Sequence, residues 1–152
     1  MKSLAEYTSL SYIKTLSSGN KFQAIDDLAR VFTDTGICDD IDLLVRSLKE
    51  REELMSTGIG FGIAIPHAKI ANVSSLSFAI GVSKEGINFD SMDGSPVHLI
   101  ILVVAGEKQH KEYLGLLSNI MGMLKKNEVK EQIIASDDPG AILSILKEYI
   151  IK

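Results

Sequence analysis

His67 is the residue whose type and setting best suit chemistry. It closes the glycine-rich segment Ser56-Thr57-Gly58-Ile59-Gly60-Phe61-Gly62-Ile63-Ala64-Ile65-Pro66-His67. A neutral imidazole is a competent nitrogen nucleophile near neutral pH, because the ordinary pKa of histidine is about 6.5. Arg51 and Thr57 lie earlier in the chain and supply a guanidinium and a hydroxyl, groups that hold a phosphoryl dianion. The pattern therefore predicts an anion site centred on His67.

The alternate glycines Gly58, Gly60 and Gly62 admit two interpretations. The more common one is a tight turn, since glycine adopts backbone angles that other residues avoid. The other is a backbone that approaches an anion closely and aims its amide groups at it. Neither nucleotide-binding motif is present: the dinucleotide fingerprint needs a glycine where Ile63 stands, and no Gly-Lys-Ser or Gly-Lys-Thr follows.

The other histidines and the cysteine suggest no rival chemistry. His98 lies in an apolar run and is interpreted as structural. No two histidines have the spacing that places two metal ligands on one helix face, so neither a metal nor a cofactor is predicted. Cys38, the only cysteine, excludes an internal disulfide and a multi-cysteine zinc site and is interpreted as a small packed residue. The chain also lacks the Gly-x-Ser-x-Gly elbow of serine hydrolases.

Composition indicates a folded, water-soluble chain. Its 152 residues are 45% hydrophobic, enough for the core of one domain. The formal charge is −4, without a basic run, which argues against a nucleic-acid partner. The longest apolar stretch, Val97–Ala105, is far shorter than the roughly 20 residues that span a bilayer, and no signal-peptide apolar region follows the first residues. We therefore expect a cytoplasmic protein.

Apolar periodicity predicts two helices before the glycine-rich segment. Asn20, with Gln23 in a capping box, begins a helix that reaches Phe32. Asp40 caps a second helix, which carries Arg51 near its charged end. The glycine-rich segment itself predicts a loop leading into a short buried strand. The opening residues show a mixed pattern that assigns no element.

Strands and then helices follow the glycine-rich segment. The predicted strands are Leu76–Val82, Ile87–Phe89 and Val97–Ala105, with a turn at Asp93-Gly94 before the last. The predicted helices run from about Lys108 to Leu124, over Glu128–Ile134, and from Pro139 behind an Asp138 cap. We therefore expect one layered domain over residues 1–152 in the α/β class, bordering on α+β, with a mixed β-sheet flanked by helices.

The stretch from Arg51 to His67 resembles the signature of the fructose/mannitol-type enzyme IIA domains of the bacterial phosphoenolpyruvate-dependent sugar phosphotransferase system. That family includes the nitrogen-regulatory enzyme IIA proteins. The likeness extends to the helix over residues 20–32, to residues 87–97 around the Asp93-Gly94 turn, and to the helix over 114–117. It therefore covers nearly the whole chain and implies the enzyme IIA fold.

The resemblance implies a phosphoryl carrier, an enzyme in the sense of a phosphotransferase component. In the family, the histidine corresponding to His67 accepts a phosphoryl group from the small histidine-containing phosphocarrier protein and passes it to a cysteine of a IIB domain. Arg51 matches the arginine expected to stabilise the phosphoryl charge, and Thr57 with the backbone of Gly58–Gly62 is expected near the same pocket. The IIB and membrane-embedded IIC partners are expected on separate chains, so any membrane contact is indirect.

One position departs from the family pattern. The family usually carries a second histidine in a His-Leu pair at the start of the helix after the long strand, where this chain has Tyr113-Leu114. His110 stands three residues earlier, about one helical turn away, and is with Tyr113 a supporting candidate. Tyrosine can hydrogen-bond a phosphoryl oxygen but does not titrate near neutral pH. Tyrosine in place of the second histidine is therefore expected to affect the onward transfer of the phosphoryl group more than its acceptance by His67.

Two alternatives to a transport carrier stay open. A regulatory protein of the nitrogen-regulatory kind would control partner proteins through the phosphorylation state of His67. A relative without phosphotransfer would bind a small anion through residues 57–62. Sugar specificity and oligomeric state have no signature in this sequence.

Overall fold

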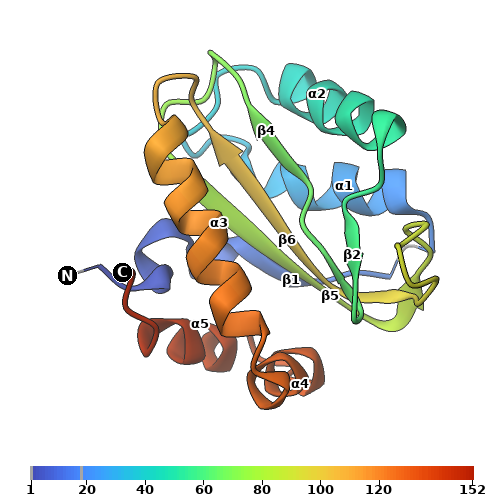
Figure 1. Ribbon diagram of the computed structural model, residues 1–152. Coiled ribbons are helices and arrows are strands. Elements are labelled where there is room, and N and C mark those ends of the chain that lie inside the picture. The colour runs from blue at the N-terminus through green and yellow to red at the C-terminus, as the bar shows by residue number, and fades with distance from the viewer. Residues whose placement is uncertain (1, 18) are drawn as a thin grey trace.

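A continuous apolar run makes β6 (Val97–Ala105) the centre of a mixed β-sheet in the computed structural model, which describes residues 2–17 and 19–152 (Figure 1). Strand β5 (Ser77–Ile87) pairs with β6 in antiparallel fashion, while β3 (Ile63–Ala64) and β4 (His67–Lys69) pair with it in parallel. The edges are β1 (Ile13–Thr15), parallel to β5, and β2 (Gly58–Gly60), antiparallel to β3. The predicted mixed sheet is confirmed.

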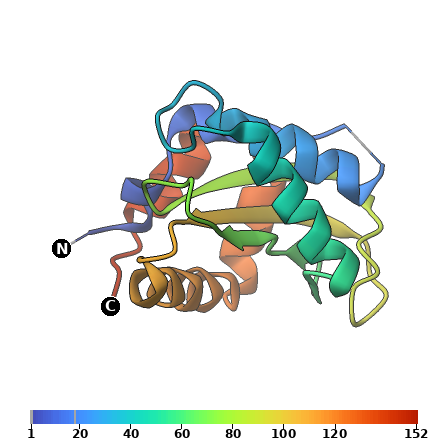
Figure 2. The same cartoon turned by 90° about the horizontal axis from the view of Figure 1, so that it is seen from above.

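Helices cover both faces of the sheet (Figure 2). Helices α1 (Lys21–Ala29) and α2 (Ile41–Leu54) pack on one face, and α3 (His110–Leu124), α4 (Asn127–Ala135) and α5 (Pro139–Lys147) on the other. Because successive side chains of a strand point to opposite faces, β6 feeds both cores. Its residues Leu99, Ile101 and Val103 join the core under α3 to α5, and the alternate residues Ile100, Leu102 and Val104 join the core under α1 and α2.

The predicted N-cap residues are confirmed, whereas the Gln23 side chain, expected in a capping box with Asn20, donates to Asp27 Oδ1 at 2.8 Å. The Asn20 side chain accepts hydrogen bonds from two backbone amides of the first turn of α1, and Asp40 accepts one from Leu43 at the start of α2. Asp138 accepts from Gly140, with Pro139 in the first turn of α5. Helix α1 is shorter than predicted, since its last turn is the 3-10 helix η3 (Arg30–Phe32).

Two strand predictions were wrong. The glycine-rich segment is not a simple loop before one strand, because β2 and β3 form a hairpin and β4 follows. Residues 87–89 are not a separate strand, since β5 continues to Ile87, which pairs with Val97 after a register shift. Gly86, at φ 91°, allows this irregularity in the strand.

The unassigned opening of the chain contains three short elements. They are the 3-10 helices η1 (Leu4–Tyr7) and η2 (Leu10–Tyr12), followed by β1. Met1 and Ser18, which the sequence interpretation also covered, lie outside the described residues. Among the residues that are described, no helix has the length and apolar character needed to cross a membrane.

Candidate functional site

The geometry of His67 leaves one ring nitrogen available for chemistry. His67 is the first residue of β4, pairs with Val103 of β6 and is half-buried. Its Nδ1 lies 2.8 Å from the backbone oxygen of Ile65. Because a carbonyl oxygen only accepts hydrogen bonds, this contact assigns the proton to Nδ1. The lone pair of the neutral ring is then on Nε2, the nitrogen that can act as a nucleophile.

A pocket of about 350 Å³ surrounds this ring. We call it the His67 pocket; its lining residues are Ser47, Arg51, His67, Ala68, Lys69, Ile70 and Tyr113. Helix α2, strand β4 and helix α3 contribute these residues. Arg51 stands in the last turn of α2, where its Nη1 donates to the backbone oxygen of Met55 at 2.9 Å. Arg51 and His67 are therefore brought together as the sequence predicts.

Tyr113 occupies the wall of the pocket opposite α2. Its ring centroid lies 6.0 Å from that of His67 and 6.4 Å from that of His110. Burial raises the pKa of the Tyr113 phenol above its ordinary value, and the nearby charge of Arg51 opposes this shift. The phenol is therefore neutral at neutral pH, a hydrogen-bonding group without charge.

Lys69 is a second cation of the pocket, which the sequence reasoning missed. Its Nζ lies 2.7 Å from Nδ1 of His110, so the ammonium donates to the ring of this exposed histidine. Of the two supporting candidates, Tyr113 lines the pocket directly, whereas His110 reaches it through Lys69. The missed signal is the spacing, because residues two apart on a strand share one face.

Thr57 lies away from the lining of the His67 pocket, contrary to the expected neighbourhood. It is buried, and its hydroxyl donates to Glu52 Oε1 at 2.5 Å while its backbone amide donates to Oε2 at 2.9 Å. Glu52 is only 2% exposed, and Lys21 Nζ approaches the same carboxylate at 3.4 Å. Glu52 stands near the charged end of α2, but its carboxylate is buried and holds Thr57.

Consecutive hydrogen bonds connect the Glu52 carboxylate to His67. The backbone oxygen of Thr57 accepts from the amide of Ile65 at 3.0 Å, and the oxygen of Ile65 contacts His67 Nδ1. Glu52 thus fixes Thr57, which fixes the peptide that orients the imidazole. Thr57 and Glu52 are therefore linked to the His67 ring by hydrogen bonds, and Glu52 is a second residue of this region that the sequence reasoning missed.

The glycine segment serves the turn and not the pocket. Gly60, Phe61 and Gly62 have φ values of 94°, 58° and 79°, and they form the turn of the β2–β3 hairpin. The amide of Phe61 donates to Asp93 Oδ2 at 2.9 Å, and that of Gly58 to Ser56 Oγ at 3.0 Å. The turn interpretation of the glycines therefore describes this backbone.

The remaining candidate residues have structural partners. His98 is half-buried, and its Nδ1 lies 2.8 Å from the backbone oxygen of Ser83. Burial raises the pKa of the Cys38 thiol, which donates to the backbone oxygen of Asp40 at 3.3 Å. Within residues 2–17 and 19–152, no group of three or more His, Cys, Asp or Glu side chains is arranged to hold a metal ion.

The fold and this pocket define a class of protein: a helix-covered mixed sheet that presents an imidazole beside two cations. The sequence model of the family described as "Phosphoenolpyruvate-dependent sugar phosphotransferase system, EIIA 2" matches residues 6–149. The chain belongs to this family of phosphoryl carriers, and it is a phosphotransferase component.

Two relatives illustrate the family in sequence. The fructose-specific EIIABC component of Bacillus subtilis is 34% identical over 134 residues, which are 88% of this chain and 21% of that protein. The chain thus spans about a fifth of that relative. The fructose-specific EIIA component of Haloferax volcanii is 35% identical over 127 residues, or 84% of this chain and 82% of that protein.

Solved structures agree on the fold. The nitrogen regulatory protein IIA-Ntr of Neisseria meningitidis superposes with a TM-score of 0.87 at 28% identity, covering 94% of this chain and 98% of that one. A complex of enzyme IIA-mannitol with phosphorylated enzyme IIB-mannitol of Escherichia coli gives a TM-score of 0.79 at 19% identity, covering 91% and 95%. The expected enzyme IIA fold is confirmed.

Proposed function

We propose that residues 1–152 act as one cytoplasmic enzyme IIA domain whose His67 is the transiently phosphorylated residue. One observation carries this proposal: the bond from His67 Nδ1 to the oxygen of Ile65, which leaves Nε2 as the free nitrogen in a pocket with two cations. The donor is the histidine-containing phosphocarrier protein, and the acceptor is a cysteine of a IIB domain.

The acceptance step exchanges one nitrogen–phosphorus bond for another. The lone pair of His67 Nε2 attacks the phosphorus of the donor phosphohistidine, and the donor nitrogen leaves with the electron pair of the broken bond. In the onward step a cysteine thiolate of IIB attacks the phosphorus, a sulfur–phosphorus bond forms, and the His67 Nε2–phosphorus bond breaks with its electron pair returning to the imidazole. The proton stays on Nδ1, which donates to the Ile65 oxygen throughout, so the ring is held in one tautomer.

The cations of the pocket stabilise the phosphoryl charge. A phosphohistidine carries close to two negative charges, which Arg51 meets from α2 and Lys69 from β4. A charge-assisted hydrogen bond contributes about 1.5–3 kcal/mol, or a factor of about 10 to 100 in rate or occupancy. The Arg51 bond to Met55 orders the guanidinium before the phosphoryl group arrives.

Tyr113 takes the place of a second titrating group in the onward step. Its neutral phenol can donate to a phosphoryl oxygen but does not gain a proton as the imidazole leaves. The His110–Lys69 contact supplies a histidine next to the pocket, and through it the position of the Lys69 ammonium depends on His110.

The direct test is phosphoryl transfer in a purified mixture of phosphoenolpyruvate, enzyme I and the histidine phosphocarrier. Intact mass and acid lability are read on wild type and on His67→Ala. We expect an acid-labile phosphoryl group on wild type that is lost in His67→Ala. Unmodified wild type in the presence of a competent donor would overturn the proposal.

A regulatory function is the second candidate, favoured by the likeness to the nitrogen regulatory protein of Neisseria meningitidis over 94% of the chain. In this case phosphorylation of His67 switches binding to a regulated protein instead of feeding sugar uptake. A pull-down with wild type, His67→Ala and His67→Asp separates the two. Phosphorylation-dependent capture of a non-transport protein supports regulation, and recovery of only a IIB partner supports transport.

A further inference from the structure

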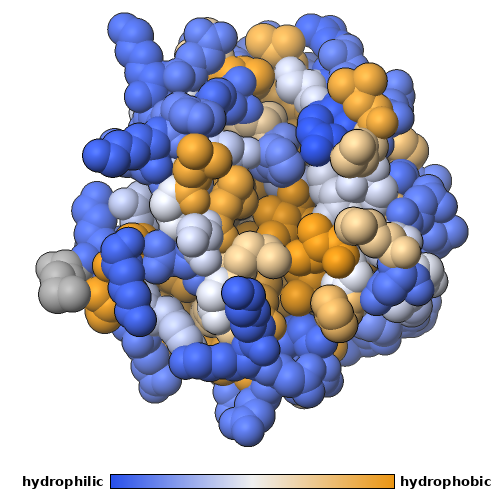
Figure 3. Space-filling model, in the orientation of Figure 1, coloured by the Kyte–Doolittle hydropathy of each residue, from blue (hydrophilic) through white to orange (hydrophobic). Residues whose placement is uncertain are grey.

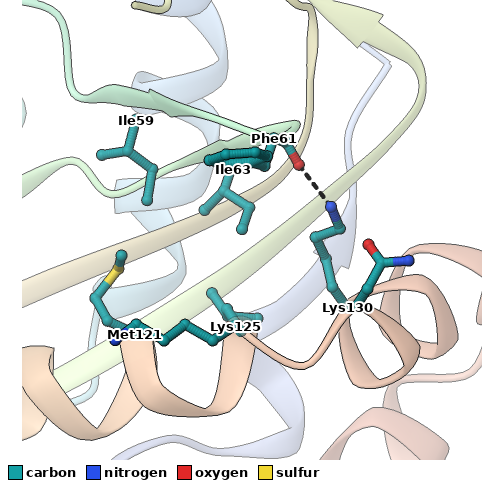
Figure 4. A pocket seen from close by; sticks show the side chains of 8 residues that line it. Ile59, Phe61, Ile63, Met121, Lys125 and Lys130 are labelled. Atoms are coloured by element: carbon teal, nitrogen blue, oxygen red, sulfur yellow. Dashed lines mark hydrogen bonds between the residues drawn. The ribbon is translucent and has the colours of Figure 1, made fainter. Parts of the chain in front are cut away.

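A second pocket, of about 470 Å³, lies between the β2–β3 hairpin and the corner where α3 meets α4. We call it the hairpin groove. Its apolar walls are Ile59, Phe61 and Ile63 on the hairpin and Met121 and Leu124 at the end of α3. Figure 4 shows these hairpin side chains facing the end of α3, and Figure 3 shows apolar side chains gathered in the hollow on this side of the molecule. The groove is therefore an apolar site with an open mouth.

The charged side chains that line the groove are all of one sign. Lys125 and Lys130 line it together with one amide, Asn127, and the lining has no acidic residue. The Lys130 side chain is 11% exposed, and its Nζ donates to the backbone oxygen of Phe61 at 2.9 Å (Figure 4). Its ion-pair partner in the described part of the chain, Glu131, is 3.9 Å away and 61% exposed. An ammonium has three donors, so Lys130 retains capacity for an anion.

The hairpin wall is held rigidly although its aromatic ring is exposed. The Phe61 peptide is fixed from both sides, because its amide donates to Asp93 and its oxygen accepts from Lys130. Its φ of 58° lies in the left-handed region, and the ring is 77% exposed. The two bonds hold an unusual backbone conformation that keeps a large apolar side chain at the mouth of the groove.

We propose that the hairpin groove binds a small amphipathic carboxylate. Its apolar body lies against Ile59, Ile63 and Met121, and its carboxylate meets the ammonium of Lys130. The volume falls within the range of about 300–1,000 Å³ of small-molecule sites, which are mostly apolar with a few polar groups that fix orientation. The uniformly positive lining selects an anion over a neutral or cationic ligand of the same shape. The proposal does not depend on phosphoryl transfer.

The first experiment titrates the full chain with octanoate, below its micelle concentration, by calorimetry and by ¹H–¹⁵N chemical shifts. We expect shifts confined to residues 59–63 and 121–130, and binding at least about tenfold tighter than that of octanol or octylamine, as expected for one charge-assisted bond. Shifts centred on His67 and Lys69 would place the anion in the other pocket and overturn the proposal.

Variants distinguish octanoate binding in the groove from non-specific attraction of the anion to lysine side chains. Lys130→Met is expected to weaken octanoate binding about 10- to 100-fold. Lys126→Met is the matched control, since Lys126 is a neighbour whose Nζ lies 5.1 Å from the Tyr149 ring centroid and does not line the groove. Phe61→Ala removes an exposed ring without touching a core, and we expect it to weaken binding while the fold persists.

Each outcome decides the proposal. Equal binding to wild type, Lys130→Met and Phe61→Ala would overturn it, as would equal affinity for octanoate and octanol. Binding to vesicles containing anionic lipid, without binding of monomeric octanoate, would assign the groove to a lipid surface and also overturn it. None of these measurements needs a phosphoryl donor, so failure here is distinct from failure of the carrier function.

Discussion

The His67 pocket and the hairpin groove lie between the same two parts of the molecule but differ in their chemistry. Residues 58–69 form one side of both, and α3 forms the other, with Tyr113 in its first turns and Met121 near its end. The offset of eight residues between them corresponds to about 12 Å along the helix. The His67 pocket gathers an imidazole, a guanidinium and an ammonium, whereas apolar side chains dominate the hairpin groove and two lysines supply its charge.

The difference comes from what anchors each pocket. The buried Glu52 carboxylate fixes the His67 pocket through Thr57, leaving Arg51 and Lys69 to face an anion. At the hairpin groove Lys130 is itself the anchor, bonded to the Phe61 backbone. The backbone beside His67 is therefore fixed by Glu52 and not by the cations of its pocket, whereas Lys130 both fixes the hairpin and keeps donors for a ligand. Substitutions should separate the two pockets.

The largest effect is expected from His67→Ala. Loss of the nucleophile should reduce phosphoryl incorporation to background, about a thousandfold or more, because no other residue of the pocket carries a free imidazole nitrogen. Intact mass of the phosphorylated chain measures this. His98→Gln, which replaces a histidine bonded to Ser83, is the control, and this variant should still be phosphorylated on His67. Octanoate binding to His67→Ala should match wild type. A loss of octanoate binding in this variant would show that the two pockets are not independent.

Arg51→Ala should slow both acceptance and onward transfer about 10- to 100-fold, because one charge-assisted contact to the phosphoryl group is lost. Rapid-quench measurement of the two steps tests this. Arg46→Ala is the matched control, an exposed arginine of the same helix that does not line the pocket. If Arg51→Ala and Arg46→Ala transfer at the same rate, the electrostatic role of Arg51 has to be abandoned.

Glu52→Gln should lower the free energy of unfolding by about 1–3 kcal/mol, since a buried charge-assisted acceptor for Thr57 becomes a neutral amide beside Lys21. Urea denaturation measures the loss, and ¹⁵N shifts of the His67 ring report whether Nδ1 keeps its proton. Glu53→Gln, at the exposed neighbour, should change stability by less than about 0.5 kcal/mol. Equal losses of unfolding free energy in both variants would show that Glu52 does not position Thr57 and the His67 ring.

The sequence predicted what depends on local pattern. Caps at Asn20, Asp40 and Asp138, the central strand and the pairing of Arg51 with His67 follow from periodicity, composition and motif. Lys69 was missed although its two-residue spacing from His67 on β4 is a local signal. Glu52 was missed because its burial beside Lys21, 31 residues away, depends on tertiary packing.

The hairpin shows the same limit of local pattern. The glycines predict a turn, but not that Phe61 would be fixed by Asp93 and by Lys130, which are 32 and 69 residues away. Spacing also placed Thr57 near the pocket, whereas its burial turned the hydroxyl to Glu52. Burial of a polar group is decided by tertiary packing, and hydrogen bonds then follow from it.

Tyr113→His should speed onward transfer several-fold, because an imidazole can protonate as the phosphoryl group leaves. The rate should then depend on pH between about 5 and 8, a range in which the wild-type phenol, with its raised pKa, stays neutral. Pre-steady-state transfer to a IIB domain across this range gives the profile. Tyr113→Phe, which keeps the ring, should show no such dependence, and a flat profile for Tyr113→His would argue against a titrating role at this position.

The smallest effect concerns the hydrogen bond from the Phe61 amide to the Asp93 carboxylate, which we call the hairpin clamp, at low pH. Hydrogen bonds to Asp93 from the Phe61 amide, then from the Ser95 side chain and amide, lower the pKa of its carboxyl from 3.8 to about 2. Because the folded-state pKa is depressed, the clamp is complete above pH about 4 and is lost as the pH falls through about 2. The ¹H–¹⁵N shift of the Phe61 amide should titrate with that midpoint and stay constant in Asp93→Asn. A midpoint near 3.8 would show that the clamp does not favour the carboxylate, and the rigid wall of the groove would lose its anchor.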